Sequence, residues 1–269
     1  MLTSNLKGPR LSTEELPCSD DTPVDNEDQN LLPNLLLFML TSLWEARTDW
    51  FFGVDMAIYH TTGVSPKVPV VPDGFLSLGV ERKKGGKSRR SYATWEENDI
   101  VPILVLEMVS HQPGKEYDEK LEIYAKLGVL YYLVYNPEFW QRDSARADLS
   151  VQHQPFELYK LMDGVYQLQL GEPYWMPELG LGIGRSRQII GGIEQEILTW
   201  YDVNGSAEVT PEMTAKELRS QLQAQQIALD EVLERLQAEQ QAKEAAQQKL
   251  EQFVAYLRSQ GIDPDQVLE

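Results

Sequence analysis

The sequence predicts an α/β domain built on a mixed β-sheet and followed by one long C-terminal helix. Two apolar runs, residues 100–110 and 129–135, flank a short helical stretch, which is typical of buried parallel strands joined by a helix. The pair Asp163-Gly164 favours a tight antiparallel hairpin next to them. Beyond Thr210, apolar residues recur at spacings of three and four, which indicates a long helix.

The N-terminal half supplies the first helix and the first strands. Residues 1–29 are polar and acidic, and predict a disordered leader. The leucine-rich run 31–47 predicts a buried helix. Residues 50–59 predict a strand, and the β-branched run 68–73 predicts another that ends in Pro72-Asp73.

The second half of the domain continues the sheet. The run 100–110 predicts a strand with Glu107 near its end, and residues 117–127 predict a helix stopped by Gly128. Residues 129–135 return as a strand, so a right-handed crossover should make the two strands parallel. The remaining expectations are strands at 156–162 and 165–170, short strands and turns over 173–184, and a helix over 189–200.

The C-terminal helix should begin with Thr210 as N-cap and Pro211 at the first helical position, and should end near Gly261. Its apolar seam consists of Leu218, Leu222, Leu229, Val232, Leu236, Ala246, Leu250, Phe253 and Leu257. Gln225, Glu239 and Lys243 interrupt the seam. We predict a coiled coil with a weakened centre that self-associates as a dimer. The alternative is a solitary charged helix.

These elements divide the chain into four parts. Residues 1–29 form the leader, 30–206 the α/β domain, 207–262 the coiled-coil helix and 263–269 a short tail. A chain of 269 residues suits one substantial domain with an appendage.

Composition bounds the cellular setting. No apolar run approaches the roughly 20 residues that span a bilayer, and a polar stretch follows Met1 where a signal peptide would be apolar. We therefore expect a cytoplasmic protein without membrane contact. The lone cysteine, Cys18, excludes an internal disulfide framework and a cysteine-based zinc site.

Net charge and its distribution bear on partners. A formal net charge of −18 argues against nucleic acid, because phosphate contacts need basic residues. Six basic residues nevertheless fall within nine positions, and could contact phosphates: Arg82, Lys83, Lys84, Lys87, Arg89 and Arg90. The alternative is a solvated loop.

Three residues are candidates for catalysis because of where they stand. Asp73 and Glu107 follow or end apolar runs, and two such carboxylates could share Mg²⁺ or Mn²⁺, which prefer oxygen ligands. Lys120 lies on the next predicted helix, with Tyr124 four residues later on the same face.

This order resembles the Uma-type restriction endonucleases, which belong to the PD-(D/E)xK nuclease superfamily. The resemblance spans about residues 30–201. It is carried by Pro72-Asp73, by Glu107 on a buried strand, and by the continuous block from Lys120 to Pro137. The usual superfamily lysine position, two residues after the glutamate, is Val109 here, and the resemblance assigns the role of that lysine to Lys120. The Ser-Pro-Ser-Thr that usually follows the glutamate in the family is replaced by Ser110-His-Gln-Pro113.

The resemblance implies a restriction-endonuclease-like fold and metal-dependent hydrolysis of DNA phosphodiester bonds. Asp73, Glu107 and the backbone carbonyl of Met108 would bind the metal ion, and Lys120 would orient the attacking water and hold a phosphate oxygen. The products would carry 5′-phosphate and 3′-hydroxyl ends. Paired in a dimer, two such sites would suit cutting both strands.

Other readings remain open at this point. Asp55 either faces the same site or is a polar residue at a strand edge, and Glu45 either assists the metal or is a surface carboxylate. The domain as a whole is either an active nuclease or an inactive nuclease-fold module that binds nucleic acid or protein and assembles through its helix. A third reading is an acidic scaffold that excludes DNA, and salt-dependent DNA binding would separate it from the others.

Overall fold

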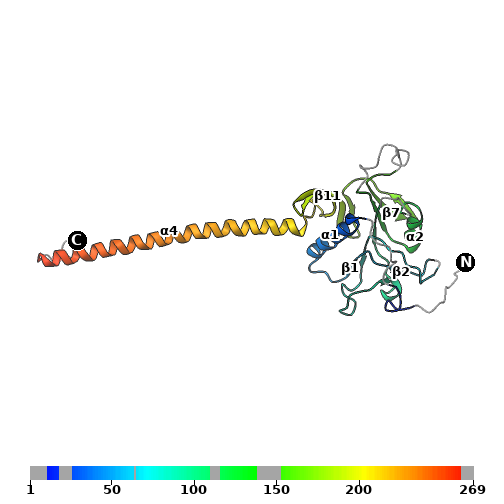
Figure 1. The fold of residues 1–269 in the computed structure, drawn as a ribbon, viewed down its shortest axis with the longest axis horizontal. Coiled ribbons are helices and arrows are strands. Elements are labelled where there is room, and N and C mark those ends of the chain that lie inside the picture. Colours follow the sequence, from blue (N-terminus) through cyan, green and yellow to red (C-terminus); the bar gives the residue numbers. More distant parts are fainter. Residues whose placement is uncertain (1–10, 18–25, 64, 110–115, 138–152, 262–269) are drawn as a thin grey trace. The chain divides into compact units, whose positions relative to one another are not determined.

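A computed structural model describes residues 11–17, 26–63, 65–109, 116–137 and 153–261. The chain forms two compact units, Met1–Pro211 and Glu212–Glu269. The first unit is a mixed α/β fold, as the sequence predicts, and the second is one long helix (Figure 1). The predicted tail, 263–269, and most of the predicted leader lie outside the described residues.

The central sheet of the first unit has six strands in the order β1-β3-β5-β6-β7-β8. These strands span, respectively, Trp50–Val54, Gly74–Leu78, Leu104–Met108, Tyr131–Tyr135, Phe156–Met162 and Val165–Leu168. β5 and β6 pair in parallel, with α2 (Glu119–Leu127) between them in sequence, and the other neighbours are antiparallel. The predicted strand, helix, strand crossover is confirmed.

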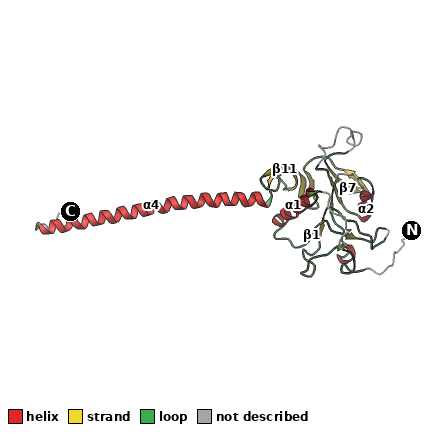
Figure 2. Cartoon of the chain, viewed as in Figure 1, coloured by secondary structure: helices red, strands yellow, loops and turns green. Residues whose placement is uncertain are grey.

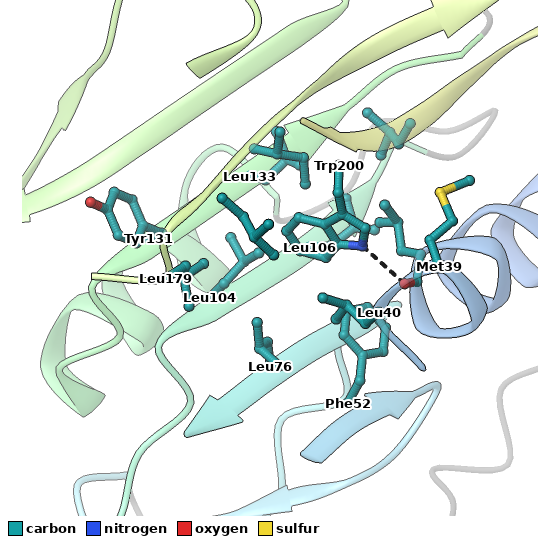
Figure 3. Close-up of a cluster of buried hydrophobic side chains, with 14 of the residues drawn as sticks. Met39, Leu40, Phe52, Leu76, Leu104, Leu106, Tyr131, Leu133, Leu179 and Trp200 are labelled. Carbon is teal, nitrogen blue, oxygen red and sulfur yellow. Dashed lines mark hydrogen bonds between the residues drawn. The ribbon is translucent and has the colours of Figure 1, made fainter. Parts of the chain in front are cut away.

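Different elements cover the two faces of this sheet (Figure 2). α1 (Glu27–Leu43) and a second sheet lie over the first face; the second sheet consists of β9 (Tyr174–Met176), β10 (Leu181–Ile190) and β11 (Ile193–Tyr201). The core on this face includes Leu104, Leu106 and Trp200, whose indole N–H donates to the carbonyl oxygen of Leu36 at 2.9 Å (Figure 3). α2 covers the opposite face, where Val105 and Val134 pack.

The alternation of side chains along β5 decides which core each residue joins. Leu104, Leu106 and Met108 belong to the core beneath α1, and Val105 and Val109 belong to the core beneath α2. Side chains of a strand alternate between faces, so Glu107 shares the face that α2 covers.

The expected disorder of the leader is wrong for residues 11–17. Leu16 is buried against a small cluster that includes Tyr59, and the hydroxyl of Tyr59 donates to the carbonyl oxygen of Pro17 at 2.7 Å. The cluster lies by the two-stranded parallel pair of β2 (Ile58–Tyr59) and β4 (Tyr92–Ala93), and η1 (Thr94–Glu96) follows β4. Burial of Leu16 anchors this short segment.

Two predicted elements differ in the structure. The predicted helix over 189–200 is wrong, because Gly191 and Gly192 adopt φ of 58° and 83° and turn the chain from β10 into β11. Glycine reaches positive φ without steric cost, and two such residues make a tight hairpin. The predicted strand over 68–73 is reduced to one isolated bridge between Val70 and Ile58. Its prolines lack the N–H groups that a ladder needs.

The second unit is the helix α4 (Pro211–Ser259), close to the predicted limits. None of its described residues is buried. Within the described parts of the chain, no helix combines the length and apolar character needed to cross a membrane.

Candidate active site

Glu107 is the buried acid at the centre of the candidate site. It lies on β5 with its backbone paired to Val134 of β6, and its side chain is only 1% exposed. A carboxylate this deep in a protein needs charged or hydrogen-bonding partners, because burial disfavours its ionised form.

α2 supplies those partners. Lys120 Nζ lies 2.7 Å from Glu107 Oε2, and the hydroxyl of Tyr124 donates to Glu107 Oε1 at 2.6 Å. The two donors are four residues apart, so one helix face presents both to a single carboxylate. Lys120 remains 26% exposed, and Tyr124 is fully buried beside Tyr132, with ring centroids 5.3 Å apart.

The C-terminus of α2 fixes this face over the sheet. Gly128 adopts φ of 91°, and its N–H donates to the carbonyl oxygens of Tyr124 and Ala125. This left-handed cap ends the helix and returns the chain at once to β6. The contacts of Lys120 and Tyr124 place α2 over Glu107.

Asp73 reaches the site from the segment just before β3. The last ladder pair of β3 and β5 is Gly74 with Leu106, so one further step brings Asp73 opposite Glu107. Asp73 Oδ2 accepts a hydrogen bond from the backbone N–H of Met108 at 2.6 Å. The site therefore lies where β3 begins and β5 ends.

The backbone carbonyl of Met108 opens to the same edge. Val109 N–H donates to the carbonyl oxygen of Tyr135 on β6, while Met108 N–H points to Asp73. In an extended strand the N–H and C=O of one residue point to the same side. Asp73, Glu107 and the Met108 carbonyl therefore converge on one edge of β5.

Burial shifts both acids toward their protonated forms. Desolvation raises the pKa of Asp73 to about 6, against the lowering effects of the Met108 N–H and the Lys120 charge. Desolvation likewise raises the pKa of Glu107 to about 7, with Lys120 opposing it and Asp73 adding to it. Burial lowers the pKa of Lys120, but the nearby Glu107 carboxylate outweighs burial and the net shift is upward. Two carboxylates with raised pKa values in one place would gain from a bound cation.

The donor set suits a hard divalent cation that keeps part of its water shell. It offers two carboxylates and one carbonyl oxygen, which are the ligand types that Mg²⁺ and Mn²⁺ prefer. Among the described residues, no cluster of three or more His, Cys, Asp and Glu side chains is placed to hold a metal ion. A metal at this site would therefore depend on the Met108 carbonyl and on water as well as on the two acids.

Two further acids influence the site electrostatically. The charges of Asp55 and Glu116 both raise the pKa of Asp73. Asp55, which is exposed, adopts φ of 46° after β1 and donates its backbone N–H to the carbonyl oxygen of Asp73 at 3.1 Å, so the backbones of the two residues are adjacent. Glu45 lies exposed beyond the end of α1.

Sequence reasoning assigned no role to Tyr124 or Glu116. The spacing of Tyr124 from Lys120 was the available signal, but only the structure shows that both donors meet the same carboxylate. Glu116 carries no comparable signal, because it precedes the helix in a stretch of charged residues. Its burial becomes apparent only from the fold.

A second polar group lies further along the same row of the sheet. Val134 pairs with Glu107 on one side and with Glu157 of β7 on the other. Glu157 Oε2 accepts from Tyr159 at 2.7 Å and lies 3.2 Å from His153 Nδ1. The His153 ring stacks on Tyr117 with centroids 3.7 Å apart.

Residues 82–90, the basic loop, make more contacts within the protein than a solvated loop would. The Arg89 side chain is 2% exposed and its Nε lies 2.9 Å from Glu97 Oε1. Lys84 Nζ lies 3.0 Å from Glu96 Oε2, and the Arg82 guanidinium lies 4.1 Å from the ring centroid of Trp50. These three cations serve contacts within the protein, because acids at the end of η1 pair with Lys84 and Arg89, and Arg82 stacks on Trp50.

The other three cations of the loop are solvent-exposed: Lys83, Lys87 and Arg90. Lys83 Nζ donates to Ser88 Oγ, and Arg90 donates to the carbonyl oxygen of Glu14; both hydrogen bonds are exposed at the protein surface. Exposed cations of this kind can contact phosphates, whereas Arg89 would first have to leave a buried ion pair.

Two comparisons with known proteins bear on the family of this chain. No curated protein matches the chain. The family model Uma2, described as "Putative restriction endonuclease", matches residues 21–189. That span contains β1 to β8, α2 and most of β10, including Asp73, Glu107 and Lys120. The match covers more than half of the sequence, and the chain therefore belongs to the Uma2 family of putative restriction endonucleases.

Proposed function

We propose that this protein is a metal-dependent endonuclease that hydrolyses phosphodiester bonds in DNA. One observation carries the proposal. Asp73, Glu107 and Lys120, from three separate segments, come together at the end of β5 in a chain of the Uma2 family. The family description supports a nuclease-type activity, and the residues supply the chemistry.

Asp73, Glu107 and the Met108 carbonyl would hold Mg²⁺ or Mn²⁺. When bound, such an ion neutralises charge that develops on the scissile phosphate. In its absence burial raises the pKa of both acids, and the charge of Asp73 raises that of Glu107 further. Metal binding would therefore ionise both acids at neutral pH.

Lys120 would contact the phosphate of the substrate beside Glu107. Its ammonium contacts one oxygen of Glu107 and keeps an exposed fraction that a substrate can reach. A flexible cation there can hold a non-bridging phosphate oxygen and orient the attacking water. Tyr124, fully buried, would position the Glu107 carboxylate and make no contact with substrate.

DNA would approach an acidic molecule, so local cations must provide the phosphate contacts. Lys83, Lys87 and Arg90 are the exposed cations of the basic loop. With few such contacts and a net charge of −18, binding should be weak and sensitive to salt.

A plasmid cleavage assay tests the proposal. Supercoiled plasmid should be nicked or linearised with Mg²⁺ or Mn²⁺ and left intact with EDTA. Asp73→Asn and Lys120→Ala should abolish cleavage while near-ultraviolet circular dichroism shows that the fold is kept. If the wild type never cuts in either metal, on double-stranded or single-stranded DNA at low salt, the protein is an inactive binding module instead.

A further inference from the structure

α4 exposes a long apolar stripe to solvent. The helix is continuous over 49 residues, and ten of its large apolar residues are 48–60% exposed, whereas Met213, Val254 and Leu257 are less exposed. The seam residues Leu222, Leu229, Val232, Leu236, Leu250 and Phe253 are all among them. A stripe of this length on an otherwise charged helix is typical of a coiled-coil surface.

The charged residues inside the seam decide which partner fits. Glu239 and Lys243 occupy successive seam positions, four residues apart. In a parallel, in-register pair each seam residue meets its own copy, so Glu239 would face Glu239 and Lys243 would face Lys243. Like charges in the core are unfavourable, because both are partly desolvated there.

An antiparallel pair removes this conflict. With the centre of pairing at Gln241, Glu239 of one helix faces Lys243 of the other, and the same contact recurs by symmetry. The neighbouring layers then match in character: Leu236 with Ala246, Val232 with Leu250, and Leu229 with Phe253. In each of these three layers, which flank the Glu239–Lys243 contacts, an apolar residue meets another apolar residue.

We propose that α4 docks against α4 of a second copy of this chain, antiparallel and centred on Gln241. The outer layers pair Gln225 with Leu257 and Leu222 with Gln260, so binding strength concentrates in the central layers. On the flank, Arg235 and Lys249 carry like charges near each other, but both residues are solvent-exposed and their repulsion is screened.

This arrangement alters the expected geometry of the dimer. Each Pro211 lies thirty residues from the centre, so the two helix ends that carry the α/β units lie roughly 90 Å apart along the axis. In a parallel, in-register pair the two Pro211 ends would instead lie side by side.

Charge reversal in the full-length protein tests the proposal. Sedimentation equilibrium measures the dimer dissociation constant for wild type, Glu239→Lys and the double variant Glu239→Lys with Lys243→Glu. The antiparallel pairing predicts about tenfold weaker association for Glu239→Lys, which makes both central contacts Lys with Lys, and recovery to near wild type in the double variant. A parallel pair would keep like-charged layers in all three proteins, so equal affinities would overturn the proposal. A wild type that stays monomeric at high concentration would also overturn it.

Disulfide trapping provides a second readout that does not depend on affinity. In a Cys18→Ser background, Leu236→Cys and Ala246→Cys proteins are mixed and oxidised. The antiparallel pair predicts a crosslink between the two different variants and little crosslinking of either alone. Crosslinks within each variant alone would show parallel pairing and contradict the proposal.

Discussion

Asp73 should weaken the metal-free fold while serving the site. Its carboxyl is half-buried, and desolvation raises its pKa from 3.8 to about 6. Because the folded pKa is above the unfolded value, stability is fully present below pH 3.8 and is lost as pH rises through 6. At pH 8 the ionised Asp73 therefore lowers the free energy of unfolding by about 3 kcal/mol.

Asp73→Asn removes this charge and keeps the shape. The amide oxygen can still accept from the Met108 N–H, although a neutral acceptor weakens that hydrogen bond by about 1 kcal/mol. The net expectation in EDTA at pH 8 is a gain of about 2 kcal/mol, or roughly 4–8 °C in melting temperature. At pH 5 the folded Asp73 is still mostly protonated, so only about half of the destabilisation has accumulated, and the gain should fall below about 1 kcal/mol.

Thermal unfolding of wild type and variant at the two pH values measures this difference. Asp163→Asn is the matched control, because it makes the same chemical change at an exposed hairpin position where asparagine also tolerates the φ of 50°. A variant no more stable than wild type at pH 8, or a gain equal at both pH values, would refute the reasoning.

Four further results are expected. Lys120→Met should abolish cleavage and cost about 2 kcal/mol at pH 8, because Glu107 loses the cation that lowers its pKa; denaturant unfolding measures the cost. Tyr124→Phe should lower kcat by about tenfold and move the acid limb of the pH–rate profile to higher pH, since its hydroxyl also lowers the pKa of Glu107; an unmoved limb would contradict this. Wild-type cleavage should rise through about pH 6 to 7 as both acids ionise, and more Mg²⁺ should shift that rise to lower pH in a rate titration. Arg89→Ala should lower the melting temperature through its buried ion pair, whereas Lys87→Ala should leave it unchanged and reduce the salt dependence of DNA binding by about one contact.

The strand and helix order around β5 and β6 could be predicted because local signals agree there. Continuous apolar runs fit strands covered on both faces, and Gly128 ends α2 by a conformation that glycine favours. The Asp163-Gly164 hairpin follows the same logic, with φ of 50° and 82°. Such elements can be predicted from the sequence because the apolar pattern and the turn residues indicate the same structure.

Other parts depend on contacts that a sequence does not display. The stretch 189–200 has apolar residues at spacings that suit a helix, and the Gly191-Gly192 turn overrides them. The run before Asp73 is β-branched, but its prolines withhold ladder donors. Lys120 and Tyr124 meet one carboxylate because α2 packs on β5, and Arg89 meets Glu97 because the loop folds back on the residues after η1. No local pattern in the sequence displays either contact.

The most direct test of the central claim is an end analysis of cleaved DNA. Wild type and the folded, stabilised Asp73→Asn variant are incubated with a labelled duplex in Mn²⁺ or EDTA, and the ends are assayed with phosphatase, kinase and ligase. A metal-dependent nuclease at Asp73, Glu107 and Lys120 predicts 5′-phosphate and 3′-hydroxyl ends from wild type in Mn²⁺ only, and none from the variant. Cleavage that persists in EDTA or in Asp73→Asn would contradict the site.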